Sequence, residues 1–422
     1  MVNIPRIPTL WPQGTGQFLR ADGIAVNGHT NEHPVVHWTE AGKARSARWR
    51  SEAGVLPPRR VVIADDSMTA DAAYHLACEG TAMLWRGDFQ NARQLLLALA
   101  RRADRKPRRS KKPAAPRTAV PMSSASQAGA FHLHRQAQSQ RARTLGMLLL
   151  PFEDGHVIPL RRAPDVQQAC TEAYGAADGP YVASLRELLG IIGAHEWRSK
   201  GVPVPALRDR IHPHYGVFAP IRSEYVGLIA TAPLPPLMSR SASFNFAFDI
   251  GTGTGVLAAV LARRGIARIV ATDQDPRALA CTRENIERLG LAAQVEVVQA
   301  DLFPEGRAPL VVCNPPWVPA RPSSPIEHAI FDPESRMLRG FLSGLAAHLE
   351  PEGEGWLVLS DLAEHLGLRT REELLAAFDA AGLKVAERMD VRPDHPRAFD
   401  DADPLHAARA AEVTSLWRLV LR

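Results

Sequence analysis

The stretch that decides the fold is Phe248-Asp249-Ile250-Gly251-Thr252-Gly253-Thr254-Gly255, an apolar run that ends in a glycine-rich turn. Glycine has no Cβ, so the backbone of such a turn can adopt positive φ and let a ligand approach closely. Further along, Val312-Cys313-Asn314-Pro315-Pro316-Trp317 ends a second apolar run with an amide, two prolines and an indole. Together, the two segments predict strands of one sheet that both end in a ligand-binding loop.

Apolar runs and helix-length segments alternate from residue 244 onward. The runs predicted as strands cover residues 246–250, 269–272, 295–298, 310–313, 357–359, 385–392 and 413–421. The segments predicted as helices cover residues 256–264, 276–289, 335–349 and 371–381. This alternation is typical of a largely parallel sheet covered by helices on both faces. We therefore predict a Rossmann-like α/β domain of seven strands, preceded by a smaller α+β domain.

The expected domain boundaries follow changes in composition. Residues 105–128 are rich in Lys, Arg, Pro, Ala and Ser, so we expect a disordered linker there. The flanking residues, 1–104 and 129–176, are expected to form the two parts of the N-terminal α+β domain. Residues 177–240 are expected to be a helical lead-in, and residues 241–422 the α/β domain.

Local signals predict some elements of the N-terminal half. Residues 60–64 have the pattern of a buried strand, and residues 71–102 have helical spacing that Gly80 interrupts. Residues 144–152 and 156–160 flank Glu153-Asp154-Gly155, which predicts a hairpin. The lead-in is expected to contain a helix over residues 181–197.

The positive charge of the chain is concentrated in one segment. The 422 residues carry a net charge of +5, but residues 101–117 alone hold nine Arg or Lys and one Asp, a local +8 that leaves the remainder at −3. A run of this kind can contact phosphates. The alternative is a solvated linker.

Cysteines, histidines and hydropathy exclude several classes of protein. The four cysteines are scattered, and neither they nor the His33/His37 and His212/His214 pairs have the partners of a zinc site, so we expect no metal. No apolar run is long enough to cross a bilayer, and residues 1–10 lack the pattern of a signal peptide. A cytoplasmic protein without a membrane partner is expected.

Acidic residues follow the first three runs of the α/β domain. Asp273, at the tip of the second run, can accept hydrogen bonds from both ribose hydroxyls of an adenosyl cofactor or of NAD. Asp275, two residues on, is the alternative for that role, but it precedes Pro276, which favours a helix N-cap. Asp301 can accept from an adenine amino group, while the N–H of Leu302 meets a ring nitrogen. An exposed loop carboxylate is the alternative for Asp301.

The Asn314 tetrapeptide has the chemistry to hold a planar nitrogen. The Asn314 side-chain oxygen and the Pro315 carbonyl can accept that nitrogen's hydrogens, which returns electron density to it and aligns it with an electrophile. Pro315 and Pro316 stiffen the turn, and Trp317 offers a flat face for stacking. The alternative is a proline-rich strand exit with a core tryptophan.

These residues carry a resemblance to a known family. Residues 214–422 resemble the class I S-adenosylmethionine-dependent methyltransferases, above all the HemK-like group, which methylates glutamine in release factors, and the related small domains that act on ribosomal RNA bases. The matching positions are Asp249, the turn from Gly251 to Gly255, Asp273, Asp301-Leu302 and Asn314-Pro315-Pro316-Trp317. The segment Gly216-Val217-Phe218-Ala219-Pro220 also looks like the lead-in that closes over the cofactor.

The resemblance implies roles for these residues and a seven-stranded sheet whose last strand runs antiparallel. S-adenosylmethionine would be held by Asp249, Gly251, Thr252, Gly253, Thr254, Gly255, Asp273, Asp301, Leu302 and Asn314. The acceptor nitrogen would be held by Asn314, Pro315, Pro316 and Trp317. We also expect Arg321, Glu327, His328 and Asp332 to line the acceptor pocket.

The acceptor itself stays open. Release-factor enzymes usually carry Tyr at the position of Trp317, and their N-terminal region is a short helical bundle, unlike this chain. We expect an N-methyltransferase acting on a protein glutamine amide, or else on the exocyclic amine of an RNA or DNA base. Two other classes remain: a non-catalytic cofactor-binding interaction protein and a nicotinamide-dependent oxidoreductase.

Overall fold

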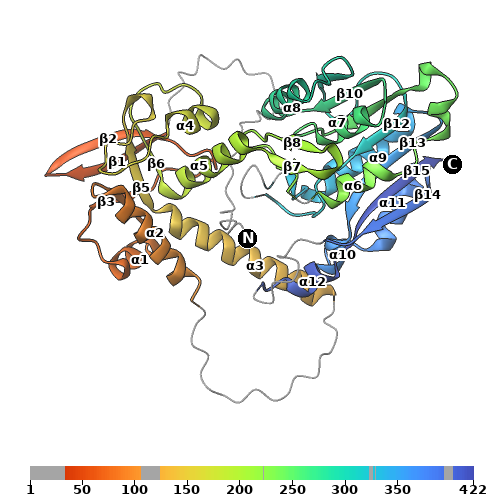
Figure 1. The fold of residues 1–422 in the computed structure, drawn as a ribbon. Helices are drawn as coiled ribbons and strands as arrows, with labels where there is room; N and C mark the ends of the chain where they lie inside the picture. The colour runs from red at the N-terminus through yellow and green to blue at the C-terminus, as the bar shows by residue number, and fades with distance from the viewer. Residues whose placement is uncertain (1–33, 106–123, 222, 323–326, 328, 394–402) are drawn as a thin grey trace, which may run out of the picture. The chain divides into compact units, whose positions relative to one another are not determined.

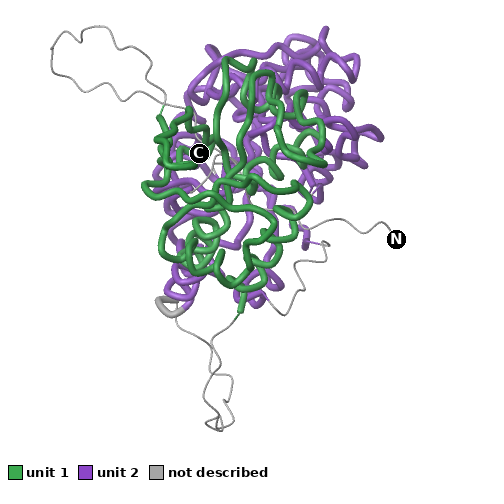
Figure 2. Tube along the Cα trace, turned by 90° about the vertical axis from the view of Figure 1, so that its left-hand side faces the viewer, with its two compact units in different colours: residues 1–120, 135–195, 323–325 green, residues 121–134, 196–322, 326–422 purple. Residues whose placement is uncertain are grey.

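The computed structural model describes residues 34–105, 124–221, 223–322, 327, 329–393 and 403–422 (Figure 1). These residues separate into two compact units (Figure 2). The first holds residues 34–105 and 135–195, and the second holds residues 124–134, 196–322 and the described residues from 327 onward. No helix in the described ranges is both long and apolar enough to span a membrane. The prediction on a signal peptide concerns residues 1–10, which lie outside the described residues.

The first unit is built on a six-stranded sheet with the order β1-β2-β6-β5-β4-β3. Its strands are β1 (Val35–Glu40), β2 (Lys43–Trp49), β3 (Arg60–Ala64), β4 (Thr81–Trp85), β5 (Leu148–Phe152) and β6 (Tyr181–Ser184). β3, β4 and β5 run parallel, whereas β6 is antiparallel to β5 and parallel to β2. Its helices are α1 (Ala70–Cys78), α2 (Phe89–Ala103), α4 (Gln167–Tyr174) and the start of α5 (Leu185–Lys200). The expected α+β class is confirmed.

Two predictions in this unit differ from the structure. The helical segment over 71–102 is broken at Gly80 into two helices, as the glycine indicated, but strand β4 lies between them and was not predicted. All five β4 residues are buried, and a strand covered on both faces has no polar alternation to distinguish it from a helix.

The predicted hairpin is wrong. β5 pairs with β4 and β6, which come from distant parts of the chain, and residues 157–160 form no strand. Glu153-Asp154-Gly155 does form a tight turn, in which Gly155 has φ of 68°. The local turn signal was therefore correct, but tertiary pairing decided which strands lie together.

Helix α3 (Ser124–Gly146) begins inside the segment expected as a linker. Residues 106–123 lie outside the described residues, whereas residues 124–128 are helical. The helix was not predicted because its polar and apolar residues show no regular spacing. Residues up to 134 group with the second unit and those from 135 with the first.

The region expected to be a helical lead-in is mixed. Residues 181–184 form strand β6 before α5 begins, so the first turn of the predicted helix over 181–197 is strand instead. Further on, β7 (Val202–Val204) pairs with β8 (Asp209–Ile211), and α6 (Glu224–Thr231) precedes the large sheet.

The second unit contains the predicted α/β sheet. Its seven strands have the order β11-β10-β9-β12-β13-β15-β14. They are β9 (Phe246–Ile250), β10 (Arg268–Asp273), β11 (Val295–Gln299), β12 (Ala308–Cys313), β13 (Leu349–Ser360), β14 (Leu383–Val391) and β15 (Thr414–Leu421). The first five run parallel, and β15 lies antiparallel between β13 and β14. All seven predicted strands and the antiparallel last strand are confirmed.

Helices cover both faces of this sheet, as Figure 1 shows. On one face, α6 and α7 (Val256–Arg263) pack against strand residues such as Trp356 and Val358. On the other, α9 (Arg336–His348) and α11 (Arg371–Ala380) pack against Leu357 and Leu359. The alternation along β13 follows from the period of two in a strand. Helix α8 (Pro276–Arg288) covers β10 and β11.

Candidate active site

The register of the parallel strands brings the predicted site segments to one edge of the sheet. β9 lies between β10 and β12, and Ile250 is paired with Thr272 on one side and Cys313 on the other. The next residues are Gly251, Asp273 and Asn314, so they leave the same edge from three adjacent strands. Neighbouring strands are about 4.8 Å apart. The glycine turn and the Asn314 tetrapeptide are therefore neighbours.

Buried hydrogen bonds hold the glycine turn from below. Asp249 is 1% exposed, and its Oδ2 accepts from the Thr252 hydroxyl at 2.7 Å and from the Ala258 N–H at 3.1 Å. Burial raises the pKa of Asp249 to about 6. The structure thus places Asp249 under the turn, where its carboxylate ties the turn to the first turn of α7. Direct contact of Asp249 with a cofactor stays a prediction.

Glycine is required in the turn for two different reasons. Gly251, Gly253 and Gly255 all have positive φ, between 57° and 80°. A Cβ on Gly255 would lie 2.9 Å from a methyl group of Thr282, so α8 packs against this position. A Cβ on Gly253 would meet no atom within 4 Å, so the backbone there is open to a ligand.

Asp273 links the glycine turn to the next loop. Its Oδ2 accepts from the Gly253 N–H at 3.1 Å, and its Oδ1 accepts from the Asp275 N–H at 3.0 Å. Burial raises the pKa of Asp273. Each carboxylate oxygen has a further lone pair for a ligand hydroxyl. Asp275 accepts from the Arg277 N–H at 2.9 Å, which confirms the predicted N-cap of α8.

The Asp301-Leu302 pair combines an exposed carboxylate with an unusual backbone. Asp301 contacts Arg336 at 3.4 Å, and both side chains are largely exposed. Leu302 has φ of 74°, a left-handed conformation that is uncommon for a leucine. The Thr272 hydroxyl donates to the Leu302 carbonyl at 2.6 Å and fixes this conformation. Such strain often accompanies a binding function.

The Asn314 tetrapeptide is tied together internally. The Trp317 indole N–H donates to Asn314 Oδ1 at 2.8 Å, so the carboxamide oxygen has a defined direction. The Trp317 ring makes an edge contact with buried Tyr225 from α6, with the ring centres 6.3 Å apart. Burial raises the pKa of Tyr225, so it stays neutral. An amide oxygen has two lone pairs, so Asn314 can still accept a substrate N–H.

Several polar residues that support the site were not predicted. Thr282 donates to the Gly253 carbonyl at 3.0 Å, and Asn285 donates to the Thr254 carbonyl at 3.1 Å. Both are fully or almost fully buried on α8, next to apolar Leu279 and Ile286. The sequence did contain a signal for this role, because Thr282 and Asn285 are polar residues three positions apart on the apolar face of a helix.

The four residues expected to line the acceptor pocket do not share one environment in the structure. Asp332 accepts from the Met337 and Leu338 N–H groups at 3.0 and 3.1 Å, so it caps α9 and offers little to an acceptor. Arg321 is exposed and Glu327 is buried, and His328 lies outside the described residues. Val318 and Phe331 form a bridge that closes the loop after the tetrapeptide.

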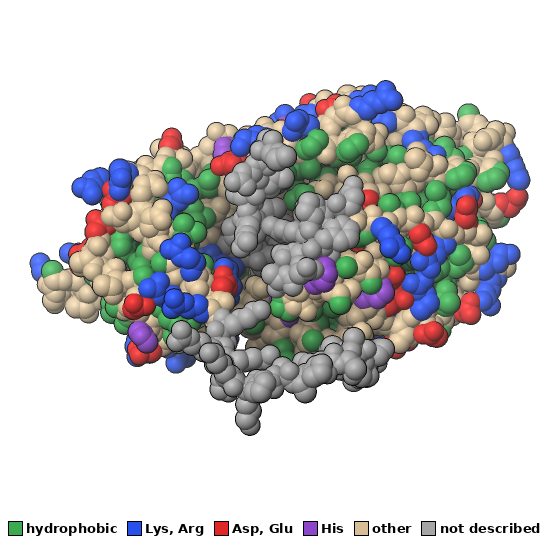
Figure 3. Space-filling model, turned by 60° about the horizontal axis from the view of Figure 1, so that its bottom comes forward, with side chains coloured by type: hydrophobic (Ala, Val, Ile, Leu, Met, Phe, Trp, Pro, Cys, Tyr) green, Lys and Arg blue, Asp and Glu red, His purple; other side chains and the backbone are tan. Residues whose placement is uncertain are grey.

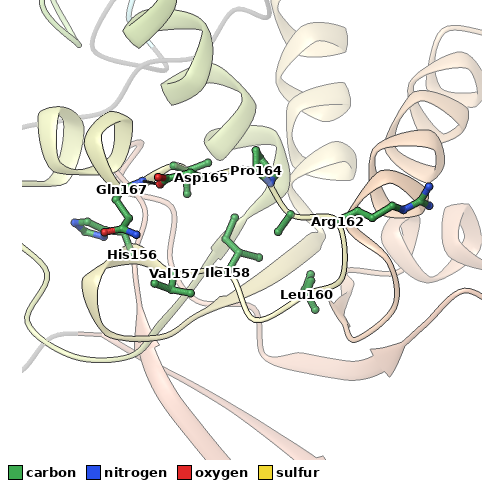
Figure 4. Close-up of a pocket in the computed structure, with 10 residues that line it drawn as sticks. His156, Val157, Ile158, Leu160, Arg162, Pro164, Asp165 and Gln167 are labelled. Atoms are coloured by element: carbon green, nitrogen blue, oxygen red, sulfur yellow. Dashed lines mark hydrogen bonds between the residues drawn. The ribbon is translucent and has the colours of Figure 1, made fainter.

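A hollow in the first unit has its polar groups engaged internally (Figure 4). It lies between β5 and α4, and His156 and Arg162 are among its lining residues. The Arg162 side chain extends away to donate to Asp88, and His156 hydrogen bonds with the Tyr181 hydroxyl and the Gly175 carbonyl. These groups are therefore part of the scaffold of the first unit.

Metal ligands do not gather in the described parts of the chain. Among those residues, no three His, Cys, Asp or Glu side chains converge as a metal site requires. His212 and His214 instead hydrogen bond with the Arg198 carbonyl and with Glu284. The four cysteines are all free.

The residues at this edge fit an adenosyl cofactor. The turn presents bare backbone at Gly253, a carboxylate with spare lone pairs stands beside it, and Asn314 follows the neighbouring strand β12 at the same edge. The deeper polar groups, Asp249 and Asn285, already hydrogen bond with the turn, with the start of α7 and with the His212 backbone. A ligand bound here would therefore meet the turn backbone, Asp273 and Asn314.

The chain is similar to known methyltransferases. The family model described as methyltransferase small domain matches residues 211–381. A ribosomal protein L11 methyltransferase of Pelotomaculum thermopropionicum is 39% identical over 144 residues, which cover 33% of this chain and 39% of the relative. A release factor glutamine methyltransferase of Cereibacter sphaeroides is 33% identical over 208 residues, which cover 44% of this chain and 65% of the relative. The chain thus spans less than two thirds of both relatives.

A longer match and a solved structure complete the comparison. A ribosomal protein L11 methyltransferase of Sorangium cellulosum is 28% identical over 294 residues, covering 65% of this chain and 85% of the relative. The crystal structure of a ribosomal protein L11 methylase from Lactobacillus delbrueckii subsp. bulgaricus aligns with a TM-score of 0.34 and 16% identity, over 51% of this chain and 86% of the other. Residues 211–381 thus match the model of the methyltransferase small domain, and the relatives that this part of the chain resembles are methyltransferases.

Proposed function

We propose that the chain transfers the methyl group of S-adenosylmethionine to a planar nitrogen, and that this nitrogen is a glutamine side-chain amide of a protein. The observation that carries the proposal is the position of Asn314, opposite Gly251 at the same sheet edge and with its amide oxygen oriented by Trp317. When bound, the cofactor would supply an electrophilic methyl on a sulfonium: as the N–C bond forms the C–S bond breaks, the sulfur leaves as a neutral thioether, and the nitrogen then loses one proton to solvent. Catalysis then requires positioning more than acid–base chemistry.

The proposed roles divide between two sets of residues. Gly251, Thr252, Gly253, Thr254, Gly255 and Asp273 would hold the cofactor, with Asp301 and Leu302 at its adenine end and Asp249 beneath the turn. Asn314, Pro315, Pro316 and Trp317 would hold the acceptor. The Asn314 oxygen and the Pro315 carbonyl would accept the two amide hydrogens, and the Trp317 ring would stack on the planar amide.

The relatives support a protein acceptor. Their names give a release factor and ribosomal protein L11 as targets, both of which are proteins. A nucleobase amine is the second candidate, favoured by the nine Arg or Lys among residues 101–117. On the face drawn in Figure 3, cationic and anionic side chains are interspersed, which is less typical of a nucleic-acid surface. A cytoplasmic setting with reduced cysteines stays part of this proposal.

The experiment that tests the proposal is methyl labelling of a fractionated lysate. The chain is incubated with tritiated S-adenosylmethionine and separated protein, RNA and small-molecule pools. We expect label in the protein pool, in a base-stable form with the mass of N-methylglutamine after digestion. Label in RNA alone would favour the nucleobase alternative, and stoichiometric cofactor binding without label anywhere would favour a non-catalytic interaction protein.

Asn314→Ala serves as the matched variant. It should lower turnover by at least about a hundredfold, because the nitrogen loses a preorganised acceptor, while cofactor affinity changes little. Equal loss of turnover and cofactor affinity would contradict the role proposed for Asn314.

A further inference from the structure

A buried guanidinium lies close to the loop that follows the Asn314 tetrapeptide. Arg369 stands between α10 (Leu362–His365) and α11. Its neighbours Leu366 and Leu368 pack in one apolar cluster with Val318 and Trp317. The chain reaches this place from the end of β13, whose Leu357 pairs with Cys313 of β12. Arg369 is therefore at the sheet edge from which Asn314 also extends.

Arg369 lacks partners for one edge of its side chain. The residue is 9% exposed, and neither Nε nor Nη2 has a hydrogen-bond acceptor among the described residues. These two nitrogens point their N–H bonds in parallel from the same edge of the guanidinium. Leaving two donors of a charged group buried and unsatisfied is costly, so the fold retains this residue against its own stability.

The neighbouring carboxylates are engaged elsewhere. Asp332, Glu364 and Glu373 are within electrostatic reach of Arg369. Glu364 accepts from Arg371 Nε with both oxygens, at 2.8 and 2.9 Å, and Glu373 accepts from the Thr370 N–H at 2.7 Å. Asp332 is occupied by the N–H groups at the start of α9. The parallel donors of Arg369 thus remain for a ligand.

The surroundings indicate what kind of ligand fits. Two parallel N–H donors match the lone pairs of a planar carbonyl or carboxyl group. The three acidic neighbours outnumber the one cationic neighbour, Arg371, and oppose a doubly charged phosphate at this position. A neutral carbonyl oxygen avoids that repulsion, and a polypeptide offers such oxygens at every residue.

We propose that Arg369 is an acceptor-binding residue, which donates from Nε and Nη2 to a carbonyl oxygen of the polypeptide whose side-chain amide is methylated. This inference rests on the proposed function. It assigns the turn between α10 and α11 to the recognition of the acceptor backbone, next to the residues that hold the reacting nitrogen.

The test compares Arg369→Met with Arg264→Met in the full chain. Arg264 is a partly buried arginine whose guanidinium donates to the Ile229 and Ala232 carbonyls, so its removal should lower the melting temperature. Arg369→Met removes unsatisfied donors, so its melting temperature should stay equal to that of the wild type or rise. The affinity for S-adenosylhomocysteine should be unchanged. The KM for the labelled protein fraction should rise by about tenfold or more, with kcat changed much less.

Each contrary outcome has a distinct meaning. If Arg369→Met lowers the melting temperature as Arg264→Met does, and KM is unchanged per folded molecule, Arg369 is structural and the inference is wrong. If the wild type labels RNA and the variant loses that labelling, the ligand is a phosphate and the inference is also wrong. If the wild type labels no protein, the proposed function fails first. The affinity for N-acetylglutamine N-methylamide, which carries two backbone carbonyls, then tests the inference separately. Weaker binding by Arg369→Met than by the wild type supports the inference, and equal affinity overturns it.

Discussion

The Trp317–Asn314 hydrogen bond connects the two halves of the candidate acceptor site at the scale of single residues. One indole N–H orients the carboxamide, and the same ring contacts Tyr225 and the apolar cluster around Val318. The resemblance to release-factor enzymes leads to the expectation of a tyrosine here. A phenol has a different reach from an indole, so the bond seen here depends on tryptophan.

Trp317→Phe should therefore lower turnover while leaving the fold intact. The variant keeps an aromatic face but loses the N–H, so Asn314 becomes free to rotate. We expect kcat to fall by about tenfold, the value of one neutral hydrogen bond, with little change in cofactor affinity. Steady-state kinetics on the labelled protein fraction measures kcat, and calorimetry measures the affinity. An unchanged kcat would mean that the indole only stacks.

Asp249 should make the stability of the protein depend on pH. Its pKa is raised from 3.8 to about 6 by burial, so the folded protein keeps a proton there that the unfolded chain releases. The contribution of Asp249 to the free energy of unfolding is therefore largest below pH 4 and falls as the pH rises to 6. Above pH 6 this contribution is lower by about 3 kcal/mol.

Asp249→Asn removes that dependence, because asparagine does not ionise. Urea unfolding of both proteins at pH 4.5 and pH 7 measures the effect, and other titrating groups cancel in the difference. The wild type should lose more stability than the variant between the two pH values. The same loss in both proteins would show that Asp249 is ionised throughout.

At the scale of elements, the start of α3 contributes to the second unit. Phe131 is 3% exposed, and its ring lies 6.4 Å from that of Phe331 in the loop after the tetrapeptide. It also shares an apolar cluster with Val318 and Leu366. A helix that precedes the seven-stranded sheet in the sequence by many residues thus packs against the loop of the candidate acceptor site.

Phe131→Ala should destabilise the second unit. Loss of a buried phenylalanine costs about 3 kcal/mol when the neighbours cannot fill the space. Leu133→Ala is the matched control, because Leu133 on the same helix is 68% exposed and should cost little. Chemical denaturation of the two variants measures the difference. Equal stability would show that the helix is not packed in solution as it is in the structure.

At the scale of the whole molecule, each unit has its own sheet and its own apolar core. The residues of the candidate cofactor site all belong to the second unit. Ligand binding stabilises only the part that binds, by about 2.7 kcal/mol at a concentration one hundred times Kd.

Differential scanning calorimetry should therefore resolve two transitions, and S-adenosylhomocysteine should raise only one of them. Asp273→Ala is the control. This substitution should reduce the rise in melting temperature that the ligand causes. It should change the melting temperature of the same transition without ligand by a smaller amount. A single transition that shifts as a whole would instead show that the two units unfold together.

The sequence by itself determined the α/β sheet and which residues meet at the edge that holds the candidate site. Strand period, glycine at positive φ and the N-cap of Asp275 are local properties, so residues close in the chain were sufficient to predict them. The carboxyl ends of parallel strands meet at one edge, which placed Gly251, Asp273 and Asn314 together without any knowledge of contacts.

Only the tertiary structure decided the rest, because it depends on residues that are distant in the chain. β5 pairs with β4 and β6 across long separations, so the local hairpin signal was misleading. The burial of Thr282 and Asn285 beneath the turn, the packing of Phe131 and the unpartnered edge of Arg369 have the same origin. A side chain's partners are set by which surfaces meet when the sheet and helices pack, and that information is not present in any short stretch of the sequence.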